Sequence, residues 1–112
     1  MRGYDKERDI EKLEDTLKAI AGMERLLASE LRDEFAEKAL ERYFEIIGEA
    51  CRGISKNIRD KYPYIPWSNI IALRNIISHE YDKIEITTLW EIAEHKIPAL
   101  KDWIQGILDE QK

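Results

Sequence analysis

The chain has 112 residues, of which 44% are hydrophobic and 37% are charged, and its formal net charge is −5. This length is enough for one hydrophobic core and excludes two domains of ordinary size, so we expect residues 1–112 to form a single domain. Cys51 is the one cysteine in the sequence, which excludes an internal disulfide and a cysteine-rich metal site.

The sequence carries no sign of a membrane or a secreted location. No apolar run approaches the roughly 18 residues that a membrane-spanning helix needs. Residues 1–7 include charged groups and no apolar signal region. We therefore expect a cytoplasmic protein with no membrane partner.

The charges are distributed unevenly along the chain. Residues 1–50 carry 9 Lys and Arg against 14 Asp and Glu, and residues 84–112 carry 3 against 6, whereas residues 51–83 carry 6 against 3. A local positive segment on an acidic chain suits a compact phosphate-containing target better than non-specific duplex binding. Ordinary scatter of three charges would explain the same excess.

Apolar residues recur at steps of three and four in the first half of the chain, which predicts amphipathic helices. The first helix should cover residues 5–28, with a break at residues 29–33. A second, longer helix should cover residues 34–60. Gly48 lies inside it, and because glycine weakens a helix interior by about 1 kcal/mol, close packing of another helix is the better reason for its presence.

Two prolines in residues 62–67 should end the helical pattern there. A third helix should begin near Trp67 or Ser68 and run to about His79, with apolar residues around nearly its whole circumference. Such a helix is either central or shared with a second subunit. A last helix should cover residues 86–108 and bend at Pro98. No segment alternates with a period of two, so we predict an all-α bundle of four or five helices with up-and-down connections.

The segment at the end of the third predicted helix concentrates groups that can act on a phosphodiester. Arg74 is a planar phosphate clamp and His79 is an acid or base near neutral pH. Asn75 and Tyr81 can form hydrogen bonds at the same phosphodiester. The alternative is a helix end whose polar residues cap carbonyl groups and face water.

Helical geometry separates the two principal groups of this segment. Arg74 and His79 are five residues apart, which places them about 140° apart around a regular helix and about 7.5 Å apart along it. Asn75 and His79 are four residues apart and do share a face. Arg74 and His79 can meet at one phosphate if the helix loosens, or if two copies meet across a symmetric dimer. The apolar circumference of the third helix favours the dimer.

Other catalytic chemistries have little support in the sequence. His79 and His95 are the two histidines, they lie on different predicted helices, and neither has a carboxylate at a recognised ligand spacing. Glu91 and His95 are explained by a solvent-exposed helix face, and no nucleophile elbow is present. We expect no metal and no cofactor. RNA supplies its own nucleophile, the 2′-hydroxyl, so Arg74 as the cation and His79 as the proton-transfer group would suffice.

The complete motif, Arg74-Asn75-Ile76-Ile77-Ser78-His79-Glu80-Tyr81, resembles the HEPN superfamily, and within it the HepT-like toxins. The likeness spans roughly residues 8–108. It extends to flanking segments that resemble the same branch: Glu45-Ile46-Ile47-Gly48-Glu49-Ala50, Ile65-Pro66-Trp67, Trp90 and Ile97-Pro98-Ala99-Leu100. Glu80, an acid directly after the motif histidine, is a departure that places a negative charge beside the expected phosphate site.

The resemblance implies a homodimeric helical bundle whose two motifs line a cleft, acting as a metal-independent RNA endonuclease. Arg74 would bind the scissile phosphate, His79 would transfer a proton, and Asn75 would orient His79 or the phosphate. Such toxins are paired with a minimal nucleotidyltransferase antitoxin, which silences them by attaching AMP to the motif tyrosine, here Tyr81. Two alternatives stay open: a non-catalytic module that binds a nucleotide or substrate for that nucleotidyltransferase, and a helical dimerisation scaffold.

Overall fold

The computed structural model describes residues 2–78 and 85–112, and the side chains of all of these except residues 2–5, 76 and 78. This part of the chain contains helices and no strand, which confirms the predicted all-α class. The six helices are α1 (Arg2–Ser29), α2 (Glu34–Arg52), α3 (Lys56–Lys61), α4 (Trp67–Ser78), α5 (Ile86–His95) and α6 (Ile97–Gln111).

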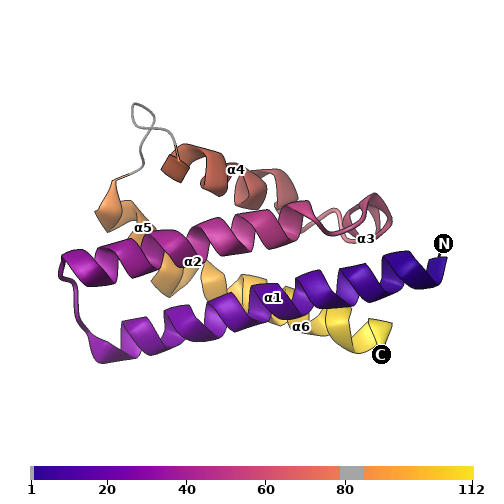
Figure 1. Cartoon of the computed structure of the whole chain (residues 1–112), viewed down its shortest axis with the longest axis horizontal. Helices are drawn as coiled ribbons and strands as arrows, with labels where there is room; N and C mark the ends of the chain where they lie inside the picture. The colour runs from indigo at the N-terminus through magenta and orange to yellow at the C-terminus, as the bar shows by residue number, and fades with distance from the viewer. Residues whose placement is uncertain (1, 79–84) are drawn as a thin grey trace.

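The helices are arranged around α2, which packs on α1 along one side and on α4 along another (Figure 1). α6 packs on α1, and α5 connects to α6 and also touches α2. α1 and α2 form an antiparallel hairpin, so groups far apart in the sequence face each other along its length (Figure 1). α4, the helix that carries Arg74, rests chiefly on α2.

The core follows from apolar stripes at helical spacing. On α2, Leu40, Phe44, Ile47 and Cys51 recur at steps of three and four, and all four are fully buried. They pack with residues from other helices into one cluster. Its fully buried members outside α2 include Leu13, Ile20, Met23, Leu89, Ile104 and Ile107. Cys51 is thus a buried free thiol.

The predicted break between the first two helices is confirmed at residues 30–33. Glu30 follows α1 with a φ of 60°, in the left-handed region that favours glycine. Asp33 then caps α2, because its side chain accepts a hydrogen bond of 2.8 Å from the backbone N–H of Ala36. The cap offsets one of the unpaired N–H groups at the start of the helix.

The prediction of one continuous helix over residues 34–60 is wrong. α2 ends at Arg52, and α3 begins at Lys56 after a turn. Ser55 accepts from the N–H of Ile58 at 3.4 Å as the cap of α3. Its own N–H and hydroxyl each donate to the buried carboxylate of Asp9 at 2.7 Å. These bonds to α1 outweigh the helical pattern, because they satisfy a buried carboxylate that would otherwise be left without partners.

The last predicted helix, residues 86–108, is two helices rather than one bent helix. α5 ends at His95, Lys96 has φ −108°, and α6 starts at Ile97 with Pro98 in its first turn. Pro98 lacks the N–H that a continuous helix would donate to the carbonyl of Glu94, and proline fits the first turn of a new helix well. The interruption therefore becomes a helix boundary.

The segment between α3 and α4 is mostly packed against the core. Tyr62, Ile65 and Trp67 are buried, and the indole N–H of Trp67 donates to the carbonyl of Tyr62 at 3.0 Å. Tyr64 instead keeps 64% of its surface exposed and meets the rings of Tyr62 and Trp103 edge-on.

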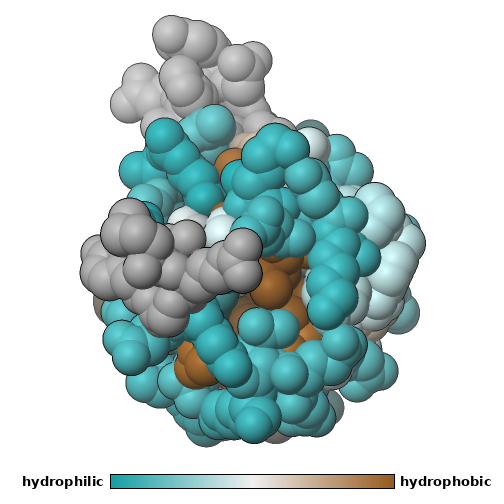
Figure 2. All heavy atoms as spheres, turned by 90° about the vertical axis from the view of Figure 1, so that its right-hand side faces the viewer, coloured by the Kyte–Doolittle hydropathy of each residue, from teal (hydrophilic) through white to brown (hydrophobic). Residues whose placement is uncertain are grey.

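The surface matches the high charged fraction of the sequence. Figure 2 looks at the end of the molecule where α3 and both termini lie, and apolar atoms are visible there only in recesses between hydrophilic side chains. Across the described ranges, none of the helices combines the length and the apolarity that crossing a bilayer requires.

Candidate functional site

Arg74 is the motif residue whose surroundings can be described in most detail. It lies on α4, and its Nε forms an ion pair with Oε2 of Glu49 on α2 at a distance of 2.6 Å. Both side chains are partly exposed, so the pair contributes only about 0.2–1 kcal/mol to stability. Its larger effect is on position, because an ion pair at Nε holds the guanidinium beside Glu49 and leaves its two terminal nitrogens for an anion.

Gly48 explains how α4 comes close enough to place Arg74 there. A Cβ atom built at Gly48 would lie 3.0 Å from Cβ of Arg74, 3.2 Å from the carbonyl oxygen of Ile70 and 3.3 Å from the backbone N of Arg74. These distances are shorter than ordinary contacts, so the residue at position 48 limits the approach of α4. The prediction that Gly48 serves close helix packing is confirmed.

Arg74 lines a groove of about 490 Å³ that runs between α1 and α2. Its lining combines four cationic side chains with three carboxylates: Lys12, Lys18, Arg42 and Arg74 with Asp15, Glu45 and Glu49. Tyr43 and small or aliphatic residues complete the walls. The groove thus has one more positive than negative group, in a chain whose net charge is negative.

The other three residues of the predicted site are placed only in part. Asn75 follows Arg74 on α4 and its side chain is exposed. His79 and Tyr81 lie outside the described residues, so their distance from Arg74 stays a prediction. The structure thus places Arg74 beside Glu49. The pairing of Arg74 with His79 stays a prediction.

Other residues of α4 line a second groove, which is mainly apolar. It has a volume of about 580 Å³, with Ile70 and Leu73 of α4 opposite Ile92, Ile97 and other residues of α5 and α6. Arg74 does not line it. α4 therefore presents a charged residue to one groove and aliphatic residues to the other.

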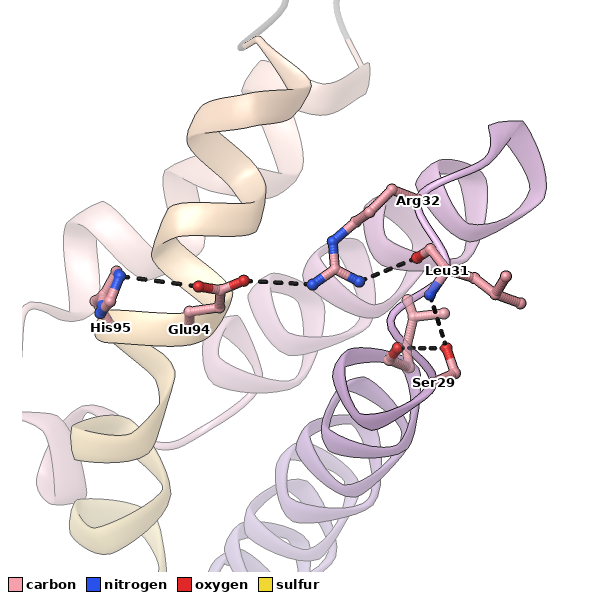
Figure 3. Close-up of polar contacts among 6 residues, drawn as sticks. Ser29, Leu31, Arg32, Glu94 and His95 are labelled. Atoms are coloured by element: carbon pink, nitrogen blue, oxygen red, sulfur yellow. Dashed lines mark hydrogen bonds and ion pairs between the residues drawn. The ribbon is translucent and has the colours of Figure 1, made fainter.

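His95, the second histidine, belongs to a surface network of charged side chains. Its Nε2 lies 3.9 Å from Oε2 of Glu94, whose other oxygen pairs with Arg32 at 3.3 Å (Figure 3). The guanidinium of Arg32 also sits 4.0 Å above the ring of Trp90, so this network fastens the α1–α2 link to α5. In the part of the chain that the structure describes, no group of three or more His, Cys, Asp and Glu is arranged to hold a metal ion.

Sequence reasoning missed Glu49 and the three cationic residues that share the groove with Arg74. Glu49 follows Gly48 directly, so the close approach predicted at Gly48 was a usable signal for a contact between its neighbour and α4. Lys12, Lys18 and Arg42 gave no such signal, because each reads as an ordinary solvent-facing charge on an amphipathic helix.

A comparison with protein families matches residues 7–107 to the family described as "Ribonuclease HepT-like". Among curated relatives, a "Putative RNase" of Methanocaldococcus jannaschii is 38% identical over 72 residues, covering 64% of this chain and 60% of its own length. A second "Putative RNase" of that organism is 40% identical over 67 residues, covering 60% of this chain and 62% of its own length.

A "Probable ribonuclease HepT" of Thermococcus cleftensis is 34% identical over 71 residues, covering 63% of this chain and 64% of its own length. The matched part of the chain thus spans less than two thirds of the length of each of these three relatives. A search of solved structures gives no significant match.

Proposed function

Because the chain belongs to the HepT-like ribonuclease family, we propose that it is a metal-independent endoribonuclease. The observation that carries the proposal is the placement of Arg74. Its Nε is paired with the carboxylate of Glu49 at 2.6 Å, and its side chain lines a groove open to solvent. A fixed planar cation at such a rim is suited to bind a phosphate and to stabilise the extra negative charge of a phosphorane.

The reaction uses the 2′-hydroxyl of the substrate as the nucleophile. The 2′-oxygen forms a bond to phosphorus and the bond to the 5′-oxygen breaks. His79 removes the proton from the 2′-hydroxyl, or supplies one to the departing 5′-oxygen, and Asn75 orients His79 or the phosphate. The products are a 2′,3′-cyclic phosphate and a 5′-hydroxyl end, and no external reactant is consumed.

A homodimer is part of the proposal, because a regular helix separates Arg74 from His79. The partly exposed apolar residues of α4, together with the apolar groove beside it, support an association of two copies. Sizing by light scattering should give twice the mass of the 112-residue chain. A monomer that cleaves RNA at full rate would contradict this part.

The test of the activity is cleavage of RNA by purified protein in the presence of a chelator. Arg74→Ala and His79→Ala should each reduce cleavage by about a hundredfold or more, because each removes a group that acts in the transition state. Lys56→Ala is the matched control, since Lys56 pairs with Asp60 on α3 and lines neither groove. Unchanged cleavage by His79→Ala would overturn the assignment.

The regulation of this activity is the finer part of the proposal. A minimal nucleotidyltransferase antitoxin would silence the toxin by attaching AMP to Tyr81, and the added phosphate would compete with RNA for Arg74. Mass spectrometry of the chain co-expressed with such an enzyme should show the added AMP, which Tyr81→Phe abolishes. The alternative function, a non-catalytic module that binds a nucleotide or substrate for the nucleotidyltransferase, predicts nucleotide binding without RNA cleavage. We keep it as the second candidate because Arg74 alone suffices for it.

A further inference from the structure

The register between α1 and α2 fixes the positions of the side chains along the groove beside Arg74. The Lys12 side chain lies against Gly53, where its Cε would be 2.9 Å from a Cβ built on the glycine. The ring of Tyr43 lies against Gly22 in the same way, at 2.5 Å. Residues 12–22 of α1 therefore run antiparallel to the end of α2 and its C-cap, residues 43–53, over about 15 Å of helix.

The cationic groups are spread along this length instead of converging on one point. Lys12 and Lys18 are six residues apart, which is about 9 Å along α1. Arg42 lies next to Tyr43, at the other end of the groove from Gly53, and Arg74 enters from α4 where it meets Glu49. One phosphate could not contact all four cations, whereas successive phosphates of a chain could.

Three of these cations are available to a ligand. Within the described ranges, no ion pair joins Lys12, Lys18 or Arg42 to a carboxylate, whereas Arg74 is bonded to Glu49. Tyr43 adds a half-buried aromatic ring to the same wall. Cations along a groove together with an aromatic surface are the combination by which proteins hold single-stranded nucleic acids.

We propose that the α1–α2 groove is a binding track for single-stranded RNA, on which Lys12, Lys18 and Arg42 contact phosphates on either side of the one held by Arg74. A base of the same strand stacks on Tyr43. This rests on the proposed ribonuclease activity and names residues that bind the substrate without reacting. The carboxylate of Asp15, which lines the same groove, opposes binding. The contacts between the cations and the phosphates make binding sensitive to salt.

The test measures binding of a fluorescent 2′-O-methyl oligoadenylate, which lacks the nucleophile and is not cut. Replacing Lys12, Lys18 and Arg42 together by Gln should raise Kd about tenfold or more at low salt. It should also reduce the slope of log affinity against log salt by about 2, because each contact to a single strand contributes about 0.7. Asp15→Asn should lower Kd, since it removes an opposing charge.

The matched control replaces two exposed lysines and an arginine that line neither groove, namely Lys6, Arg25 and Lys56. This control removes the same number of positive charges as the groove variant, so it measures the effect of net charge alone. Its Kd should change by no more than about threefold, as expected for screened charges outside the site. An equal rise in Kd for the two triple variants would refute the proposal that the groove binds RNA.

A second arm tests the aromatic contact. Tyr43→Phe keeps the ring and its packing on Gly22, and should bind the oligoadenylate as the native chain does. Tyr43→Leu should weaken that binding about fivefold or more, because base stacking on an aromatic ring is lost. It should leave binding of an abasic oligomer unchanged, and an equal loss for both oligomers would overturn the stacking contact.

These measurements separate the track from the activity. If the native chain binds the uncut oligomer through these residues but cleaves no RNA, the proposed ribonuclease function fails and the track stands. If Arg74→Ala abolishes cleavage while the groove variants bind normally, the track fails and the ribonuclease function stands.

Discussion

The glycine at the contact between α2 and α4 allows the placement of Arg74 to be tested without touching Arg74. Gly48→Ala adds one methyl group facing α4. Alanine favours a helix interior over glycine by about 1 kcal/mol. The new Cβ would lie 3.0–3.3 Å from atoms of Ile70 and Arg74, two of them backbone, so α4 must shift by a few tenths of an ångström. Overpacking of this kind costs about 1–3 kcal/mol, which leaves a net destabilisation of about 0–2 kcal/mol.

Gly106→Ala is the matched control, because Gly106 is an exposed helix residue of α6 with no atom within 4 Å of a built Cβ. It should stabilise the chain by about 0.5–1 kcal/mol through helix propensity alone. The two substitutions should therefore differ by about 0.5–3 kcal/mol in the free energy of unfolding. Guanidinium unfolding followed by circular dichroism, at one protein concentration, measures the difference.

RNA cleavage gives the second readout of the same pair of variants. A shift of α4 moves Arg74 relative to Glu49, so Gly48→Ala should reduce cleavage while Gly106→Ala leaves it at the native rate. If Gly48→Ala stabilises the chain as much as Gly106→Ala and cleaves normally, α4 does not approach α2 as closely as described, and the reasoning about Arg74 is refuted.

Three further predictions follow from single residues. Glu49→Gln should lower kcat about three- to tenfold, because Arg74 loses its charged partner, while the free energy of unfolding changes by less than about 0.5 kcal/mol; an unchanged kcat would show that Glu49 does not position Arg74. Glu30→Gly should raise the midpoint of thermal unfolding, because it relieves a positive φ worth about 1 kcal/mol, and Glu30→Ala should not. Burial raises the pKa of the Cys51 thiol from 9.0 to about 12, so above pH 9 only the unfolded chain ionises and stability falls as pH rises towards 12. Denaturant unfolding should show the native chain losing about 1.4 kcal/mol per pH unit more than Cys51→Ala, and equal slopes would mean that the thiol is not buried.

The helices were predictable wherever a local signal coincides with the end of a pattern. The break after α1 and the start of α4 at Trp67 are of this kind. The turn between α2 and α3 was not predictable, because it depends on Asp9, some 46 residues away, accepting two hydrogen bonds from Ser55. Pro98 predicted correctly where the last helix is interrupted. It did not show that the helix ends there, since sequence alone does not distinguish a bend in one helix from a boundary between two.

The candidate site divides in the same way. The motif residues could be recognised from their types and spacing, and Gly48 predicted the contact that brings α4 to α2. The groove could not be predicted, because it depends on the register between α1 and α2, which sets Lys12 beside Gly53 and Tyr43 beside Gly22. That register is a property of packing over many residues and leaves no trace in the pattern of either helix.

The dependence of α4 on a single neighbour has a consequence for local stability. α4 rests chiefly on α2, and a groove lies along each of its sides. Its amide hydrogens can therefore exchange with solvent through an opening that leaves the packing of α1, α2 and α6 intact, at a lower free energy than unfolding of the whole chain. The fraction of molecules with Arg74 in place is then set by this local equilibrium, and a ligand that bound Arg74 would protect α4 from exchange.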